Sequence, residues 1–267
     1  MADLHYTHRA ERPSRRQLCL AIGLLALGLS AWTPGQGPGA AQAEESPTVV
    51  ELFTSQGCYS CPPAEAFLGE LAERSDLIAL EFHVDYWDDL VYGAAGQWKD
   101  PFSDPAYTRR QQTYARTIPG SRVYTPQMVI DGRLETVGSR RGAVLERINA
   151  ARRDRPEPPR LTVERSAGSG LTVALEGSTA EPLELWLVTF DQERVTRVDA
   201  GENKGKTLAS HHIVRAMERL GSWSGGPLSL PIAEAPSGAN VGCAILAQAP
   251  RQGPILAARY CPATPGA

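Results

Sequence analysis

The residues best suited to chemistry are two cysteines separated by two positions, in the segment Cys58-Tyr59-Ser60-Cys61. A buried strand is predicted before the segment and a helix after it. The N-terminus of a helix offers free N–H groups and positive potential, which favour a thiolate over a thiol. The thiolate is the reactive species in thiol–disulfide exchange. We therefore expect Cys58 to attack a substrate and Cys61 to resolve the mixed disulfide.

Two prolines directly after this pair bear on where the helix begins. If Cys58 capped the helix, Pro62 and Pro63 would stand where backbone N–H groups should donate to carbonyl oxygens, and proline has no N–H. The alternative is a helix with Pro62 at its first position, where proline is favoured. In that case Cys61 caps the helix, and the dipole acts on Cys61 more than on Cys58.

A second component of the predicted site is Thr125-Pro126, which precedes an expected strand at residues 127–130. A proline that heads a strand after a loop is a common place for a cis peptide bond. We expect Pro126 to lie beside the two cysteines and to orient the substrate, with Thr125 in support.

His83 and Asp85 stand near the end of a predicted strand at residues 77–85, and their alternation places them on one side of it. That end of a strand is where open α/β sheets bind ligands. His83 is a candidate base towards a thiol or, with the two cysteines, a metal ligand. The simpler interpretation is a structural histidine that forms a hydrogen bond near Trp87.

Cys243 and Cys261 stand in two predicted strands joined by a turn that contains proline and glycine. If the hairpin is centred on Gln252, each cysteine is nine positions from the centre, so the two lie opposite each other. We therefore expect a structural cross-strand disulfide. The segment Gly201-Glu202-Asn203-Lys204-Gly205 is interpreted as a solvated turn.

The wider pattern predicts two domains. In residues 44–153 strands are expected at 48–54, 77–85, 127–130 and 134–137, with helices around 64–71, 106–116 and 140–153; Asp131-Gly132 predicts a hairpin. Residues 154–160 hold three prolines and four charges, which indicates a linker. In residues 161–267 strands are expected at 161–165, 171–175, 183–190, 241–248 and 255–260, whereas 208–220 suits either a strand or a helix. We interpret this second half as a small, β-rich, sandwich-like domain.

Residues 1–43 have the features of a secretory signal peptide. Several arginines precede an apolar run of about 14 residues, which is shorter than the ~20 needed to span a bilayer, and Ala41-Gln42-Ala43 provides a cleavage site after Ala43. The paired Arg15 and Arg16 resemble a twin-arginine export signal. Cleavage removes Cys19. We expect the exported protein to be periplasmic or secreted and to have no membrane attachment.

Composition narrows the function classes. Hydrophobic residues make up 42% of the 267 residues and charged residues 21%, which excludes a disordered or collagen-like chain. The formal net charge is −3, and no basic run is present that could neutralise a phosphate backbone. We therefore expect no nucleic-acid partner.

Several segments together resemble one known family. They are Phe53-Thr54-Ser55-Gln56-Gly57-Cys58, Cys61-Pro62-Pro63-Ala64, Phe82-His83-Val84-Asp85-Tyr86-Trp87-Asp88, Trp98-Lys99-Asp100-Pro101-Phe102, Tyr124-Thr125-Pro126-Gln127 and, further on, Gly201 to Gly205 with His211 and Val214. The chain resembles the secreted, thioredoxin-like domain-of-unknown-function 1223 family over nearly its whole exported length. The resemblance implies an α/β thioredoxin-like fold for residues 44–153, and an export route. Residues 90–97 look longer than the usual connection there.

These observations predict an exported thiol–disulfide oxidoreductase that needs no cofactor and acts on a protein, peptide or small-molecule thiol through Cys58 and Cys61. One alternative is a copper- or zinc-binding module that uses Cys58, Cys61 and His83, since thiolates suit soft metals. The other is a non-catalytic thioredoxin-like binding domain in which the Cys58–Cys61 bond only staples the chain.

Overall fold

The computed structural model describes residues 46–166 and 168–263. The predicted signal peptide, its cleavage site after Ala43 and Cys19 lie outside the described residues. In the described ranges, no helix combines the length and the apolar character needed to cross a membrane.

Helices and strands mostly begin and end within two residues of their predicted positions. The helices are α1 (Pro62–Ala72), α2 (Pro105–Thr117) and α3 (Arg141–Arg153), with short 3-10 turns η1 (Gly93–Ala95) and η2 (Pro250–Gln252). The strands are β1 (Thr48–Thr54), β2 (Leu77–His83), β3 (Gln127–Ile130), β4 (Leu134–Val137), β5 (Arg160–Arg165), β6 (Leu171–Glu176), β7 (Leu183–Arg197), β8 (Thr207–Trp223), β9 (Leu228–Ile232), β10 (Val241–Gln248) and β11 (Ile255–Tyr260).

Strand β1 is buried on both faces, as its continuous apolar run predicts. Val49 and Phe53 face one hydrophobic core, whereas Val50 and Leu52 face another, because side chains alternate along a strand. Helices α1 and α3 cover the Val50 face, and α2 covers the opposite face. β1 pairs in parallel with β2 through the α1 crossover, and antiparallel with β3, which pairs with β4.

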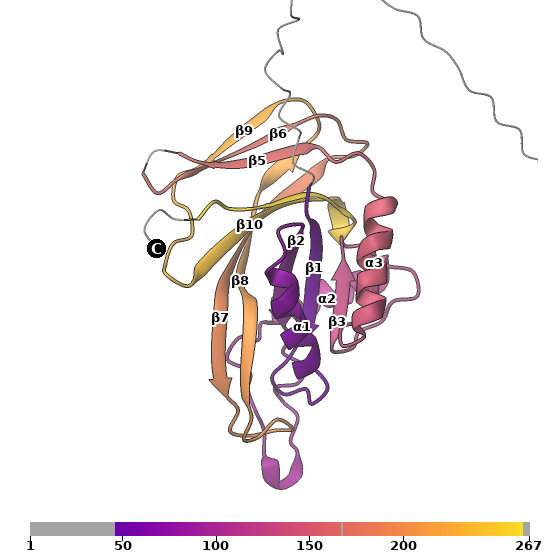
Figure 1. Ribbon diagram of the computed structural model, residues 1–267, viewed down its shortest axis with the longest axis vertical. Helices are drawn as coiled ribbons and strands as arrows, with labels where there is room; N and C mark the ends of the chain where they lie inside the picture. The colour runs from indigo at the N-terminus through magenta and orange to yellow at the C-terminus, as the bar shows by residue number, and fades with distance from the viewer. Residues whose placement is uncertain (1–45, 167, 264–267) are drawn as a thin grey trace, which may run out of the picture. The chain divides into compact units, whose positions relative to one another are not determined.

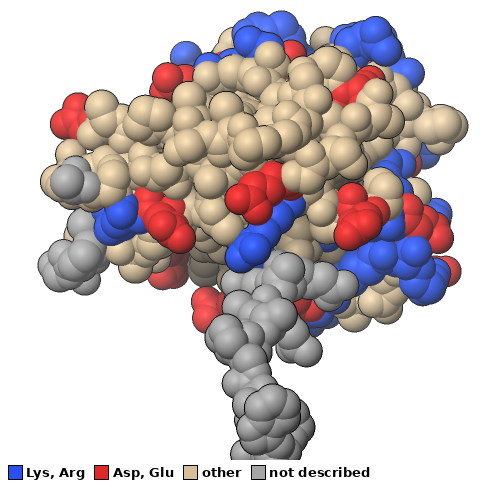
Figure 2. All heavy atoms as spheres, turned by 90° about the horizontal axis from the view of Figure 1, so that it is seen from above, with Lys and Arg blue, Asp and Glu red and all other residues tan. Residues whose placement is uncertain are grey.

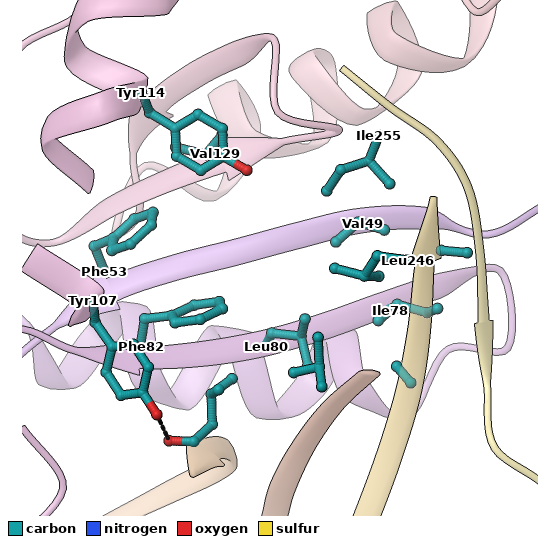
Figure 3. Packing of buried hydrophobic residues seen from close by; sticks show 14 of the residues in the cluster. Val49, Phe53, Ile78, Leu80, Phe82, Tyr107, Tyr114, Val129, Leu246 and Ile255 are labelled. Atoms are coloured by element: carbon teal, nitrogen blue, oxygen red, sulfur yellow. Dashed lines mark hydrogen bonds between the residues drawn. The ribbon is translucent and has the colours of Figure 1, made fainter. Parts of the chain in front are cut away.

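Strands from the second half of the chain extend this sheet. The strand order is β11-β10-β7-β8-β2-β1-β3-β4, and β8 joins β2 in parallel where Glu81 pairs with Ile213. In the core between the two halves, Leu246 and Ile255 pack with Val49 and Ile78 (Figure 3). The sequence predicted a sandwich separate from the first half. In the structure, residues 154–160 lead from α3 to β5 of a small second sheet, and the later strands β7, β8, β10 and β11 join the sheet of the first half.

The small sheet β5-β6-β9 forms a second layer (Figure 1). Leu161 and Val173 from this sheet belong to one hydrophobic cluster with Leu185 and Ile245 of the large sheet. The fold is therefore mixed α/β, with one large mixed sheet and one small antiparallel sheet. Strand β9, which contains Pro231, was not predicted from the sequence.

The ambiguous segment at residues 208–220 is part of β8, a strand of 17 residues. Its pairing with β7 shifts register twice, so that Arg215 and Leu220 have no residue opposite them on β7. Each extra residue reverses the inward and outward alternation, which is why the strand has no clean two-residue period in the sequence. β7 also continues seven residues beyond its predicted end at Phe190, through a mostly exposed polar stretch.

Two local predictions about turns are confirmed. Asp131 and Gly132 both have positive φ, 48° and 66°, and join β3 to β4 as a hairpin. Cys243 and Cys261 form a disulfide with Cα atoms 5.3 Å apart, and the Cys261 N–H donates to the Cys243 carbonyl at 2.8 Å. The hairpin register is therefore the one inferred from a centre at Gln252.

Acidic and basic side chains are interspersed over the face of the molecule shown in Figure 2. On that face, neither sign of charge forms a continuous patch.

Candidate functional site

Cys58 and Cys61 form a disulfide between the end of β1 and the start of α1, with Cα atoms 5.4 Å apart. Helix α1 begins with Pro62 and Pro63 in its first two positions, and Cys61 is the residue that caps it. The Cys61 carbonyl accepts the N–H groups of Ala64 and Glu65. Of the two helix starts that the prolines allowed, the structure has the later one, and the dipole is directed at Cys61.

Cys58 stands outside the first helical turn, in a tight loop. Its carbonyl accepts the Cys61 N–H at 3.2 Å, and its sulfur lies 3.5 Å from the Ser60 hydroxyl. Both cysteines are 0% exposed, although Tyr59 between them is 65% exposed. The disulfide is therefore covered by surrounding side chains and backbone.

The Thr125–Pro126 peptide bond is cis, as the sequence predicted. Phe53 pairs with Gln127 in the β1–β3 ladder, so Pro126 comes alongside Thr54, at the end of β1 that leads to Cys58. The Pro126 carbonyl accepts the N–H of Gly138, and a Cβ added at Gly138 would lie 3.1 Å from Ala64 Cβ. The cis proline is thus held at the same end of the sheet as the first turn of α1.

Trp87 links Thr125 to the cysteine loop. Its indole Nε1–H donates to Thr125 Oγ1 at 2.9 Å, and a Cβ added at Gly57 would lie 3.3 Å from Trp87 Cβ. Its ring also stacks with Tyr92 from the segment between β2 and α2. The structure therefore brings Trp87 and Thr125 close to the cysteine loop.

His83 and Asp85 do not face each other. β2 ends at His83, two residues earlier than predicted, so the alternation that would have placed both side chains on one side is lost. Asp85 accepts the hydroxyl of Thr108 on α2. His83 is fully buried, and its Nδ1 and Nε2 lie 2.7 Å from Asp100 Oδ2 and 2.9 Å from Glu81 Oε1.

Both ring nitrogens of His83 are thus occupied by carboxylates rather than directed at the cysteine sulfurs. Burial opposes the charged form, but Asp100 and Glu81 raise the pKa of His83 well above its ordinary value. Among the residues that the structure describes, no three His, Cys, Asp or Glu side chains are arranged to hold a metal ion. Phe102 covers the imidazole edge-on at 5.3 Å, which matches the interpretation of His83 as a hydrogen-bonded histidine.

A fourth titratable group, Glu65, belongs to the same buried region. It lies one turn from Cys61 on α1, and its Oε1 accepts the Thr54 hydroxyl at 2.7 Å. Burial, followed by the negative charge of Glu81, raises the pKa of Glu65 to about 8. No hydrogen-bond partner for Glu65 Oε2 is present in the described part of the chain. The residue following the cysteine pair by four positions is therefore a buried acid that holds its proton near neutral pH.

Asp100 connects this buried cluster to the cysteine loop. Its Oδ2 accepts the Gln56 N–H at 2.7 Å as well as the His83 hydrogen bond. Burial opposes the ionised form, but His83 and the backbone donors hold the pKa of Asp100 below its ordinary value. The cysteine loop is therefore hydrogen-bonded through Gln56 to the buried pair of His83 and Asp100.

The turn at Gly201 to Gly205 is not simply solvated, as the sequence suggested. Asn203 is fully buried, and its Nδ2 donates to the carbonyls of Gln56 and Cys58, both at 2.9 Å. Glu202 Oε2 accepts the Tyr59 N–H at 2.9 Å. The tip of the β7–β8 hairpin therefore lies on the cysteine loop, at the end of the molecule where β1 and β7 point in Figure 1.

Sequence reasoning missed four residues of this site: Glu65, Asp100, Glu202 and Asn203. Glu65 carried a usable signal, because a glutamate stood among Ala64, Phe67 and Leu68 on the buried side of a helix. The sequence signal for Glu202 and Asn203 was weaker, because the residues that they contact are more than 140 positions away in the sequence.

Comparison with known proteins adds a family and a fold neighbour. A crystal structure of protein AGR_C_4864 from Agrobacterium tumefaciens is similar, with a TM-score of 0.70 and 27% sequence identity; the match covers 84% of this chain and 98% of that one. Comparison with curated proteins finds no match. The model of the family described as "Protein of unknown function (DUF1223)" matches residues 49–248. The chain therefore belongs to the DUF1223 family.

Proposed function

We propose that this protein is an exported thiol–disulfide oxidoreductase whose first half is thioredoxin-like. The observation that carries the proposal is the placement of the Cys58–Cys61 disulfide between β1 and α1, at the sheet end that also holds the cis Pro126. The order β1, α1, β2, α2, β3, β4, α3 is the one that the thioredoxin resemblance implies. Export is supported by the predicted signal peptide and by a second disulfide, because disulfides persist in oxidising compartments.

The reaction is an exchange of two electrons between two pairs of sulfur atoms. In the reduced protein the Cys58 thiolate attacks a substrate disulfide, forms a mixed disulfide, and expels one substrate thiolate. The Cys61 thiolate then attacks the Cys58 sulfur, which restores the Cys58–Cys61 bond and releases the second substrate thiolate. The substrate gains two electrons and the protein loses two. The same steps run in reverse when the substrate is a dithiol.

Each neighbouring residue has a role in this scheme. Pro126 and Thr125 orient an extended substrate chain beside Cys58. Glu65 keeps its proton near neutral pH, because burial and the charge of Glu81 raise its pKa to about 8, so it adds no negative charge one turn from Cys61. His83 and Asp100 hold the loop through Gln56 and do not touch the sulfurs.

One specific observation favours the alternative of a structural staple: both cysteines are 0% exposed. An exchange reaction requires access to a sulfur, so the surrounding chain must open locally. The metal-binding alternative is less well supported, because each ring nitrogen of His83 already faces a carboxylate, and one of these two partners would have to be displaced before His83 could become a ligand.

A redox titration of the purified exported protein tests the proposal. The protein is equilibrated with dithiothreitol mixtures of graded potential, its thiols are alkylated, and modified cysteines are mapped by mass spectrometry, with metal analysis under reducing conditions. We expect Cys58 and Cys61 to titrate in the folded protein with a potential above about −300 mV, because purely structural bonds lie lower. Opening of this disulfide only on unfolding would support the staple, and stoichiometric metal would support the metal module.

A further inference from the structure

The tip of the β7–β8 hairpin, residues 198–206, is built to hold a fixed shape. Its turn is closed by hydrogen bonds from Gly205 N–H to the Val198 carbonyl and from Lys206 N–H to the Asn203 carbonyl. Gly201 and Gly205 have φ of 72° and 85°, a conformation that favours glycine. The Gly201 N–H also donates to the Ala95 carbonyl, which ties the tip to η1.

Two side chains of this tip hold the cysteine loop on either side of Cys58. The Asn203 amide spans the carbonyls of Gln56 and Cys58, and its own Oδ1 accepts the Lys206 ammonium at 2.8 Å. The Glu202 carboxylate accepts a hydrogen bond from the N–H of Tyr59, the residue next to Cys58. Lys206 also lies 4.2 Å from the centre of the Tyr59 ring. Four contacts therefore join the second half of the chain to the loop that carries the disulfide.

These contacts have two physical consequences. They hold the loop in the arrangement in which both cysteines are 0% exposed, so an attacking thiolate reaches a sulfur only when this arrangement opens. They also place the Glu202 carboxylate on the N–H of Tyr59, directly after Cys58, where its negative charge opposes a thiolate on Cys58. The closed tip therefore suits the uncharged disulfide better than a Cys58 thiolate.

We propose that Glu202 and Asn203 form a latch that closes over the oxidised Cys58–Cys61 pair, opposes attack on it, and is weakened when Cys58 becomes a thiolate. This deepens the proposed function and rests on it. The two residues are positioning residues, since neither touches a sulfur in the scheme above. An open tip would free the Tyr59 N–H and the Cys58 carbonyl to form hydrogen bonds with an extended protein or peptide substrate.

Reduction by dithiothreitol provides a balanced reaction on which to test the latch. One thiolate of the reagent bonds to the Cys58 sulfur, the Cys58–Cys61 bond breaks, and its electron pair stays on Cys61. The second thiolate of the reagent then closes a cyclic disulfide and leaves Cys58 as a thiolate beside Glu202. The reagent loses the two electrons that the protein gains.

The experiment measures the rate of this reduction in folded protein for the wild type, Glu202→Gln, Asn203→Ala and Asn203→Asp. Asn203→Asp keeps the shape of the side chain but turns a carboxylate towards two carbonyl oxygens. Lys204→Gln, an exposed position in the same turn, is the matched control. We expect the Asn203 variants to be reduced about tenfold faster, since each loses two hydrogen bonds in the closed state, and the control to match the wild type.

A second readout separates a latch from general loosening of the fold. In the reduced protein, the thiolate absorbance of Cys58 is followed against pH. We expect Glu202→Gln to lower the pKa of the Cys58 thiol by about half a unit to one unit, whereas the Lys204→Gln control leaves it unchanged. Glu65 and Asp100, the other carboxylates close to this loop, are unaltered in all variants. Amide hydrogen exchange at residues 198–206 should increase on reduction.

The outcomes distinguish the latch from the function on which it rests. Equal reduction rates in all variants, with the disulfide opening in the folded state, would overturn the latch and leave the oxidoreductase proposal standing. A disulfide that opens in every variant only when the protein unfolds would overturn both. Faster reduction in the Asn203 variants together with the Glu202→Gln shift would support the latch.

Discussion

Replacing Glu65 with glutamine should remove a large pH dependence of stability. Glutamine has the shape of the protonated acid and cannot ionise. The pKa of Glu65 rises from 4.5 to about 8 on folding, because the side chain is buried near Glu81. Since the folded-state pKa is the raised one, the contribution of Glu65 to stability is full below pH 4.5 and is lost as the pH rises towards 8.

The size of the effect follows from the difference between the ordinary pKa and the pH. At pH 7 the unfolded chain has released a proton that the folded protein keeps. This pH lies 2.5 units above the ordinary glutamate pKa of 4.5. Keeping the proton at pH 7 therefore lowers the free energy of unfolding of the wild type by about 3 kcal/mol. Glu65→Gln avoids this cost. We expect its free energy of unfolding, relative to the wild type, to rise by about 3 kcal/mol between pH 4 and pH 7.

Urea denaturation of the oxidised protein at a series of pH values measures this difference. Glu70→Gln is the control, because Glu70 lies on the exposed side of the same helix and its hydrogen bonds to Arg141 lower its pKa. Its difference from the wild type should stay flat between pH 5 and pH 7. Parallel curves for Glu65→Gln and the wild type over that range would refute the reasoning, since Glu65 would then be ionised in the folded protein.

Three further predictions concern the disulfides, a buried ion pair and export. Mild reductant should open Cys58–Cys61 and leave Cys243–Cys261 intact, which alkylation followed by mass mapping would show. Cys243→Ser should lower the free energy of unfolding by about 2–4 kcal/mol. Cys58→Ser should lower it by less, because the Cys58–Cys61 disulfide closes a shorter loop. Arg110→Met should destabilise by about 3–5 kcal/mol, because it leaves the buried carboxylate of Glu51 without its cation; the double variant with Glu51→Gln should recover much of this loss in the same urea assay. N-terminal sequencing of the exported protein should begin at Glu44, and retention of the apolar run at residues 18–31 would contradict the predicted cleavage.

Local sequence patterns were sufficient where neighbouring residues decide the structure. The apolar run of β1, the Asp131-Gly132 hairpin and the strand register around Gln252 all depend on residues close in sequence. The same holds for the start of α1, because Pro62 and Pro63 leave few places where the helix can begin.

Patterns failed where a distant segment decides the structure. β8 is a strand because it pairs with β7 and joins β2, and its two register shifts remove the alternation that would identify it locally. The sheet that both halves share also depends on pairing between strands that are far apart in the sequence. No property of residues 154–160 indicates that the strands after the linker return to the sheet before it.

The candidate site divides in the same way. The sequence alone pointed to the cysteine pair and to Pro126 with Thr125, because their residue types and spacing are local features. Only the tertiary structure placed Glu65, His83, Asp100 and Asn203 around that pair. The burial of the first three depends on how the helices and loops pack on the sheet, and Asn203 reaches Cys58 across more than 140 positions because the two halves of the chain pack together. The cysteine pair and the cis proline can thus be predicted from local sequence, whereas the protonation of the buried groups around them and the burial of the two sulfurs depend on the folded chain.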